Sequence, residues 1–177
     1  MCPFELVTDG WHLSGTMTDV RASALVRFRA AKLGAADRLR TWVAHLALQL
    51  AAPTDHPRTT IFHGTDLTVR FQPVADAADQ LSALLASYAQ GISAPLRYFP
   101  ETSWEFAVRT DGIKGGRTEP LQAARNVWLG SDYNRPESGD RWFQLAFRGV
   151  DDPLDAEFER LALAVVRPML QSMEETE

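Results

Sequence analysis

The sequence predicts a protein of the mixed α/β (α+β) class, in which a mixed sheet built early in the chain is flanked by helices. Alternating apolar and polar residues fill the opening positions, and helical patterns with apolar stripes dominate the second half. With 177 residues, 45% of them hydrophobic, the chain suffices for one core, since a domain of roughly 150 residues buries about 70% of its unfolded surface. We therefore expect a single domain over residues 1–177.

The opening segment predicts an antiparallel meander of three strands. Pro3–Val7 is short and apolar, and Asp9-Gly10 is a dipeptide typical of tight hairpin turns. From Trp11 onward the side chains alternate between two faces, and a polar turn then leads into a third strand at Ala24–Arg29. Strands that follow one another so closely usually pair with their neighbours in the chain.

A helix over Ala35–Ala51 follows the opening strands, and Pro53 ends it. Its apolar residues repeat at the spacing of one buried stripe, which comprises Leu39, Trp42, Val43, Leu46 and Leu50. The segments Arg58–His63 and Asp66–Phe71 then predict a second hairpin.

A second helix runs from about Val74 to Gln90, with Gly91 as its stop signal. The residues expected on its inward face are Leu81, Leu84, Leu85 and Tyr88. The proline-bounded stretch Ser93–Pro100 is expected to be an extended connector. Aromatic residues in connectors are candidates for an exposed interface or for stacking on bases; here they are Tyr98, Phe99 and Tyr133.

The rest of the chain predicts four helices, at Glu101–Thr110, at Glu119–Leu129, at Arg141–Arg148 and from Asp152-Pro153 onward. We expect the loop Asp111–Arg117 to be mobile and Ser131–Asp140 to be a polar loop. The last helix is expected to bury Leu154, Phe158, Leu161 and Val165. Pro168 is expected to kink or end this helix, and the acidic tail Glu174–Glu177 to fray.

Charge and cysteine content narrow the function classes. Lys and Arg number 18 against 23 Asp and Glu, a net charge of −5, whereas a protein that binds DNA unaided usually carries a basic excess. Any DNA contact is therefore local or shared with a partner. Cys2 is the only cysteine, which excludes an internal disulfide and fits a reducing compartment. No apolar run approaches the roughly 20 residues of a membrane span, so we expect a cytoplasmic protein without membrane contact.

The strand–turn–strand–helix opening invites comparison with restriction-endonuclease-like (PD-(D/E)xK-type) nucleases. Their centre places an acid at the end of one strand, then an acid and a lysine two residues apart on the next, so that the carboxylates hold a divalent metal. Here Thr18 stands at the first acidic position, and Arg27 and Arg29 stand at the second acid and the lysine. Asp19 is offset by one residue, which turns its side chain to the opposite face. We therefore expect an inactive fold of this type, with no catalytic residue, no metal and no cofactor.

Other interpretations of these residues stay open. Arg27 and Arg29 are either an ordinary solvated strand face or contacts for phosphate or for a partner's carboxylates. An active metal-dependent nuclease is the main alternative function, and its acids would be Asp19 with Glu5 or Asp37. A third class is an interaction module unrelated to DNA repair.

Several blocks carry a resemblance to a known family along nearly the whole chain. They are Gly15–Val20, Ala24–Arg29, Leu39–Leu46, Tyr88–Leu96, Phe99–Glu101, Leu121–Arg125, Arg141–Leu145 and Arg167–Leu170. The Gly-Ile-Ser-Ala-Pro-Leu string at Gly91–Leu96 is the most specific of them. These blocks resemble the carboxy-terminal domain of RecC, the gamma subunit of exodeoxyribonuclease V, which is the RecBCD ATP-dependent helicase–nuclease.

The resemblance implies a nuclease-like domain that has lost its metal-binding residues and is a fragment of a longer chain. It implies a role as scaffold and DNA guide in double-strand-break repair and DNA degradation, with RecB, RecD, the remaining RecC domains and separated DNA strands as partners. Arg21, Arg27, Arg29 and Lys32 are then the candidate contacts for DNA or a partner. Because the helicase-like domains of RecC are absent, we expect neither unwinding nor Chi recognition from this chain alone.

Overall fold

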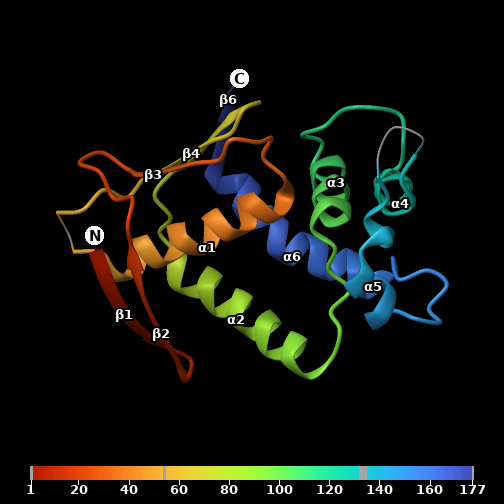
Figure 1. Ribbon diagram of the computed structural model, residues 1–177, viewed down its shortest axis with the longest axis horizontal. Helices are drawn as coiled ribbons and strands as arrows, with labels where there is room; N and C mark the ends of the chain where they lie inside the picture. Colours follow the sequence, from red (N-terminus) through yellow and green to blue (C-terminus); the bar gives the residue numbers. More distant parts are fainter. Residues whose placement is uncertain (1, 54, 132–134, 177) are drawn as a thin grey trace. The chain divides into compact units, whose positions relative to one another are not determined.

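The computed structural model describes residues 2–53, 55–131 and 135–176, and the chain divides into two compact units. One unit joins Met1–Ser87 to Met169–Glu177, and the other is Tyr88–Pro168. The structure is mixed α/β with a mixed sheet flanked by helices, as the sequence predicts (Figure 1). A single domain over residues 1–177 stays a prediction. None of the described helices is long and apolar enough to cross a membrane.

The first unit opens with the predicted hairpin of β1 (Cys2–Thr8) and β2 (Trp11–Met17). At its turn Asp9 has φ 46° and Gly10 has φ 78°. Positive φ at both central residues is what a two-residue type I′ turn requires, and Asp-Gly adopts it at low cost. The hairpin is thus specified by residues next to each other in the chain.

The strand β3 (Leu25–Phe28) does not complete an antiparallel meander, and that prediction is wrong. A single antiparallel bridge, Val20↔Leu25, joins it to the segment after the hairpin, and it pairs in parallel with β4 (Thr60–His63). A parallel pair needs a crossover connection, which α1 (Ala35–Ala51) supplies. The short alternating pattern predicts which side chains share a face of β3, but it does not predict the strand with which β3 pairs.

The sheet has the strand order β3-β4-β5-β6. The predicted second hairpin is confirmed, because β5 (Thr68–Phe71) pairs antiparallel with β4. The tail was expected to fray, but its described residues form β6 (Met173–Thr176), which pairs antiparallel with β5. Arg38 Nε donates a hydrogen bond to Glu175 Oε1 at 2.7 Å, and this charge-assisted contact favours the strand despite its acidic sequence. Glu177 lies outside the described residues.

The helix α1 contacts the sheet through a face that is more polar than predicted. Trp42 and Leu46 are buried as expected, but Val43 is 42% exposed. The buried polar residues of this helix are Asp37, Arg38, Thr41 and His45. His45 is tolerated in the core because its ring nitrogens lie 2.9 Å from Thr60 Oγ1 and 2.9 Å from the carbonyl oxygen of Gln72.

The helix α2 (Ala77–Ser93) is longer than predicted at its carboxyl end. Gly91 was expected to stop it, but Gly91 is not among the glycines with positive φ, so it continues the helix instead of capping it. Pro95 follows shortly after the helix ends. Tyr88 is 59% exposed, which corrects its assignment to the inward face.

The second unit is helical in its described residues, with α3 (Pro100–Thr110), α4 (Pro120–Leu129), the 3-10 helix η1 (Glu137–Gly139), α5 (Arg141–Ala146) and most of α6 (Ala156–Ser172). Phe99 is 0% exposed, and its ring centroid lies 4.3 Å from that of Trp128 and 5.0 Å from that of Phe143. The expectation of an exposed Phe99 is therefore wrong, and the hydroxyl of Tyr98 is buried as well. Tyr133 lies outside the described residues.

The helix α6 begins after the predicted start at Asp152-Pro153. The Asp155 carboxylate accepts hydrogen bonds from the N–H groups of Glu157 and Phe158 at 3.0 and 3.2 Å, so Asp155 caps the first turn. The helix continues through Pro168, and the proline does not end it. The predicted buried positions are confirmed at Leu154, Phe158, Leu161 and Val165.

Candidate functional site

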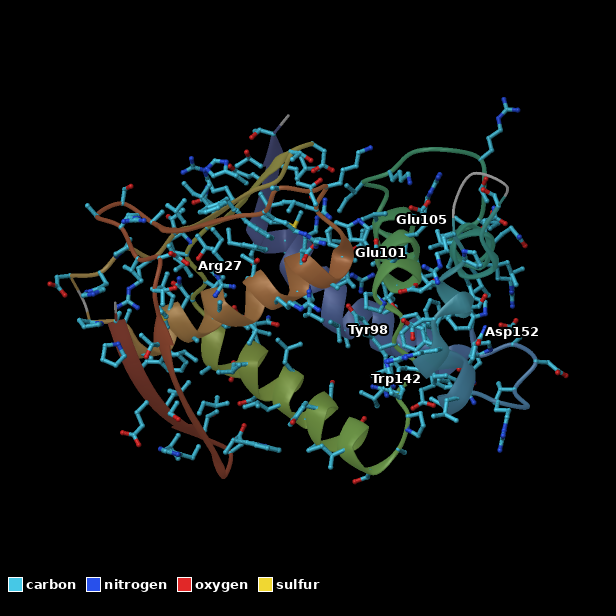
Figure 2. The ribbon with its side chains drawn as sticks, in the orientation of Figure 1. Arg27, Tyr98, Glu101, Glu105, Trp142 and Asp152 are labelled. Carbon is cyan, nitrogen blue, oxygen red and sulfur yellow. The ribbon has the colours of Figure 1, made fainter. Side chains whose placement is uncertain are left out.

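A pocket of about 460 Å³ lies in the first unit beside β3 and the first turns of α1. Its lining comprises Asp19, Arg27, Phe28, Arg29, Asp37, Arg40, Thr41 and Phe62. Figure 2 labels Arg27, whose side chain lies next to α1. The structure therefore brings together both arginines that the sequence placed at degenerate nuclease positions.

The crossover geometry of the sheet explains why these residues meet. Arg27 and Arg29 are two residues apart in an extended segment, so their side chains leave β3 on the same face. The connection to β4 carries α1 back across that face. Asp37 and Arg40, from the first turns of α1, complete the lining beside them.

The end of the opening hairpin meets β3 on its other edge. The N–H of Val26 donates to the carbonyl of Asp19 at 3.0 Å, beside the bridge Val20↔Leu25. Continuing this antiparallel register places position 18 across from position 27. Thr18 itself is exposed, and its hydroxyl donates to Asp19 Oδ2 at 3.0 Å. The position of the expected first acid is thus occupied by a hydroxyl turned toward Asp19.

Asp37 is the buried electrostatic centre of the pocket, with 8% exposure. Its Oδ2 accepts a hydrogen bond from the N–H of Gly34 at 3.1 Å and one from Arg29 Nη1. Its Oδ1 lies 3.5 Å from Nη1 of Arg40. One carboxylate therefore orients two guanidiniums, and it also stands at the positive end of α1.

Cationic side chains outnumber anionic ones in this lining, with three guanidiniums against two carboxylates. The side chain of Arg27 forms no hydrogen bond or ion pair with another described residue. Because the chain as a whole carries a net charge of −5, the pocket is a local reversal of the global charge. Such a site attracts an anion rather than a cation.

A comparison with protein families identifies the family in which this pocket occurs. The model of the family described as the RecC C-terminal domain matches residues 2–111, which is more than half of the chain and includes the whole pocket lining. The chain belongs to this family. It is also similar to the RecBCD enzyme subunit RecC of Escherichia coli (strain K12), with 29% identity over 155 residues. That match covers 81% of this chain and 14% of the relative, so the chain spans about one seventh of the length of that RecC subunit.

The other two candidate contacts of this RecC C-terminal domain lie outside the pocket. Arg21 and Lys32 are both exposed, in the segments just before and just after β3, and neither contributes to the lining. Of the four predicted basic residues, Arg27 and Arg29 therefore line the pocket. Arg21 and Lys32 lie on the surface, on either side of β3 in the chain.

The acids proposed for an active nuclease are only partly brought together. Asp19 and Asp37 both line the pocket, whereas Glu5 lies on β1, where its carboxylate is 2.5 Å from His12 Nε2. Within the described part of the chain, no three His, Cys, Asp or Glu side chains gather as metal ligands would. Asp37 is moreover engaged by Arg29, Arg40 and a backbone N–H, so it is not free to bind a divalent ion.

Sequence reasoning missed four residues of the pocket lining, Phe28, Arg40, Thr41 and Phe62. Arg40 follows Asp37 by three residues, a spacing at which helical side chains meet, so the pair was readable from the sequence. Phe28 lies within the predicted third strand, but no function was assigned to it. It is 82% exposed, the highest exposure of any large apolar side chain described.

Proposed function

We propose that this RecC C-terminal domain is a non-catalytic scaffold that contacts RecB and RecD subunits and guides separated DNA strands in a RecBCD-type complex, in double-strand-break repair and DNA degradation. The observation that carries the proposal is the placement of Arg27 and Arg29 in one pocket with Arg40, where a nuclease of this type would hold its metal. Guanidiniums disfavour Mg²⁺ by charge and recognise phosphate or carboxylate by geometry. Family membership supports the complex in which this would occur.

The fold we propose is restriction-endonuclease-like and catalytically inactive, and it covers residues 1–177 as one RecC carboxy-terminal domain. Three features support it: the opening hairpin, the antiparallel bridge from its end to β3, and the helical crossover to a parallel strand. Thr18 and Arg27, which face each other when the bridge register is continued, stand at the two positions where such enzymes carry acids. Loss of both acids removes the means of binding a catalytic metal.

A co-purification experiment tests the scaffold role. The 177-residue chain, carrying an affinity tag, should retain RecB and RecD subunits from a mixture in which neither is tagged. A tagged chain that retains neither subunit would contradict the proposal.

The DNA-guiding role is tested in the assembled complex with the double variant Arg27→Glu, Arg29→Glu. Charge reversal should slow unwinding of a labelled duplex and weaken its salt-sensitive DNA binding, because it replaces phosphate attraction with repulsion. The matched control is Arg148→Glu, Arg160→Glu, which reverses two exposed arginines of the second unit. Equal unwinding by both double variants and the parent would show that the pocket takes no part.

An active nuclease is the second candidate, and one observation favours it: Asp19 and Asp37 line the same pocket. Cleavage of labelled single-stranded DNA by the purified chain in Mn²⁺ or Mg²⁺, lost in Asp19→Asn, would establish it. We expect no cleavage, because the cation-rich lining opposes binding of a divalent metal.

A further inference from the structure

We propose that the uncovered face of the sheet in the first unit binds an amphipathic helix of a partner subunit, one that carries a carboxylate beside its apolar stripe. The proposal rests on the proposed function and assigns the protein contact of the scaffold to one surface. We call this surface the open face, and it is the side of the sheet turned away from α1. Its residues are Val26, Phe28, Ile61, His63, Thr68, Arg70, Glu174 and Thr176.

The two faces of the sheet differ in what covers them. On one face the ring centroid of Phe71 lies 5.4 Å from that of Trp42, and Thr60 Oγ1 lies 2.9 Å from Nδ1 of His45, so this face packs against α1 (Figure 1). Val69 points the same way and is fully buried. Because side chains alternate along a strand, the residues between these point to the opposite side. None of the eight residues of the open face is buried.

The open face is apolar over one half only. Val26, Phe28 and Ile61 lie on β3 and β4, which pair in parallel, and Phe28 is 82% exposed. The residues that β5 and β6 contribute are polar, and these two strands pair antiparallel. Antiparallel strands commonly leave one face in water, whereas parallel strands are normally covered by helices on both faces. The apolar half is therefore the part of the sheet that a second helix would cover.

Arg70 indicates the charge of the partner. It lies directly across from Ile61 in the register of β4 and β5, so its side chain stands at the border of the apolar half. Among the described residues it has no side-chain hydrogen bond or ion pair, and Glu174 lies one strand farther from the apolar half. A helix that lays an apolar stripe on Val26 and Phe28 therefore gains a contact with Arg70 when it carries a carboxylate beside that stripe.

The experiment measures binding of purified RecB and RecD subunits, each added separately to the immobilised 177-residue chain. Phe28→Asp should weaken binding of at least one subunit about tenfold or more, because it places a charge where an apolar side chain would be buried. Phe28→Leu should keep the affinity within about threefold, since an apolar group remains. The matched control is Val7→Asp, at a 71% exposed residue of β1, which should bind as the parent does. Thermal unfolding of each variant checks that the fold is intact.

Arg70→Glu tests the charge of the partner helix. It should weaken binding of the same subunit severalfold, and added salt should narrow the difference from the parent, because ions screen the exposed contact. Arg148→Glu reverses an exposed arginine of the second unit and should leave the affinity unchanged.

The outcomes separate this inference from the scaffold function. Equal binding of both subunits by Phe28→Asp and by the parent would overturn the inference and leave the scaffold function standing. A parent chain that is dimeric in sedimentation and becomes monomeric in Phe28→Asp would assign the open face to a second copy, which would also overturn it. A parent chain that binds neither subunit would contradict the scaffold function, and the inference would fall with it.

Discussion

At the scale of single residues, the fold constrains the chemistry of His45. It is 0% exposed and stacks on Trp42, with ring centroids 5.5 Å apart. Its Nε2 lies 2.9 Å from the carbonyl oxygen of Gln72, which only accepts, so Nε2 carries the proton. Nδ1 then accepts from the hydroxyl of Thr60 at 2.9 Å. The ring is thus a neutral bridge from α1 to the sheet.

Burial lowers the pKa of His45 to about 4, although the hydrogen bond with Gln72 opposes the shift. Because the folded pKa lies below the unfolded value of 6.5, the unfolded chain binds the proton first as the pH falls. Stability from this group is therefore complete above pH 6.5 and is lost progressively down to about pH 4. The total loss should be about 3 kcal/mol in the free energy of unfolding.

Urea unfolding between pH 7 and pH 4 measures this loss. His45→Gln should flatten the pH dependence, since its amide can donate to Gln72 and accept from Thr60 without titrating. His63→Gln, at an exposed histidine of β4, should leave the dependence as in the parent. A parent chain with the same stability at both pH values would show that His45 does not control it.

At the scale of elements, the carboxylate of Glu105 links α3 to the loop that follows it. Glu105 accepts from Arg109 Nε at 2.9 Å and from Lys114 Nζ at 2.7 Å (Figure 2 labels Glu105). Burial alone would raise the pKa of Glu105, but the hydrogen bonds from Lys114 and Arg109 outweigh it and hold the pKa below its ordinary value. The contribution of this cluster to stability is therefore present above the unfolded pKa and is lost as the pH falls through the folded one.

Glu105→Gln should release the loop, because the amide cannot hold both cations. Trypsin should then cleave after Lys114 and Arg117 several times faster than in the parent. Glu119→Gln, which changes an exposed carboxylate beside the loop, should leave the rate unchanged. Equal cleavage rates for Glu105→Gln and the parent would mean that the backbone hydrogen bonds from Ile113 and Lys114 to Val108 suffice.

The strand β6 depends on Arg38, which is 6% exposed and bonds to both Glu175 and the carbonyl of Leu33. Glu175→Gln should cost about 1–2 kcal/mol in the free energy of unfolding, since it removes the charge from a hydrogen bond to a nearly buried guanidinium. Glu174→Gln alters the preceding residue, which points to the other face of the strand, and should cost less than about 0.5 kcal/mol. Chemical unfolding of the two variants compares their losses in the free energy of unfolding. Equal losses would contradict the role of the contact between Arg38 and Glu175 in stabilising β6.

The elements also show where sequence reasoning succeeds. The opening hairpin and α1 were predicted well because a turn dipeptide, a stripe of apolar residues and a terminating proline act within the segment itself. The partner of β3 and the existence of β6 were not predicted, since both depend on contacts distant in the chain, such as Arg38 with Glu175. An acidic tail has no strand pattern of its own to read.

The pocket residues also divide into those that the sequence predicted and those that it did not. Resemblance to a nuclease centre singled out Arg27 and Arg29, and strand alternation correctly placed them on one face. Arg40 joined them only through the crossover of α1. Asp37 was named only as a possible metal ligand of the alternative nuclease. In the structure its carboxylate contacts the guanidiniums of Arg29 and Arg40, and the contact with Arg29 could not be predicted from the sequence alone.

At the scale of the whole molecule, the two units carry separate buried clusters. One is formed by residues of the first unit, including Leu25 and Leu48, and the other by residues of the second unit, including Phe99 and Trp128. Separate clusters predict that a core substitution in one unit destabilises that unit more than the other, because a cavity removes packing contacts from the side chains that line it.

Phe99→Ala, at the centre of the second cluster, tests whether the two units respond separately to core substitutions. Removal of a fully buried phenylalanine should cost about 3–5 kcal/mol. If the units open independently, amide hydrogen exchange should accelerate in α3 and α4 by two orders of magnitude or more while β4 and β5 keep the protection of the parent. Leu48→Ala, at a fully buried position of the other cluster, should give the reverse pattern. Acceleration across both units by either substitution would instead show one cooperative domain, because a cavity then lowers the free energy of a single global opening.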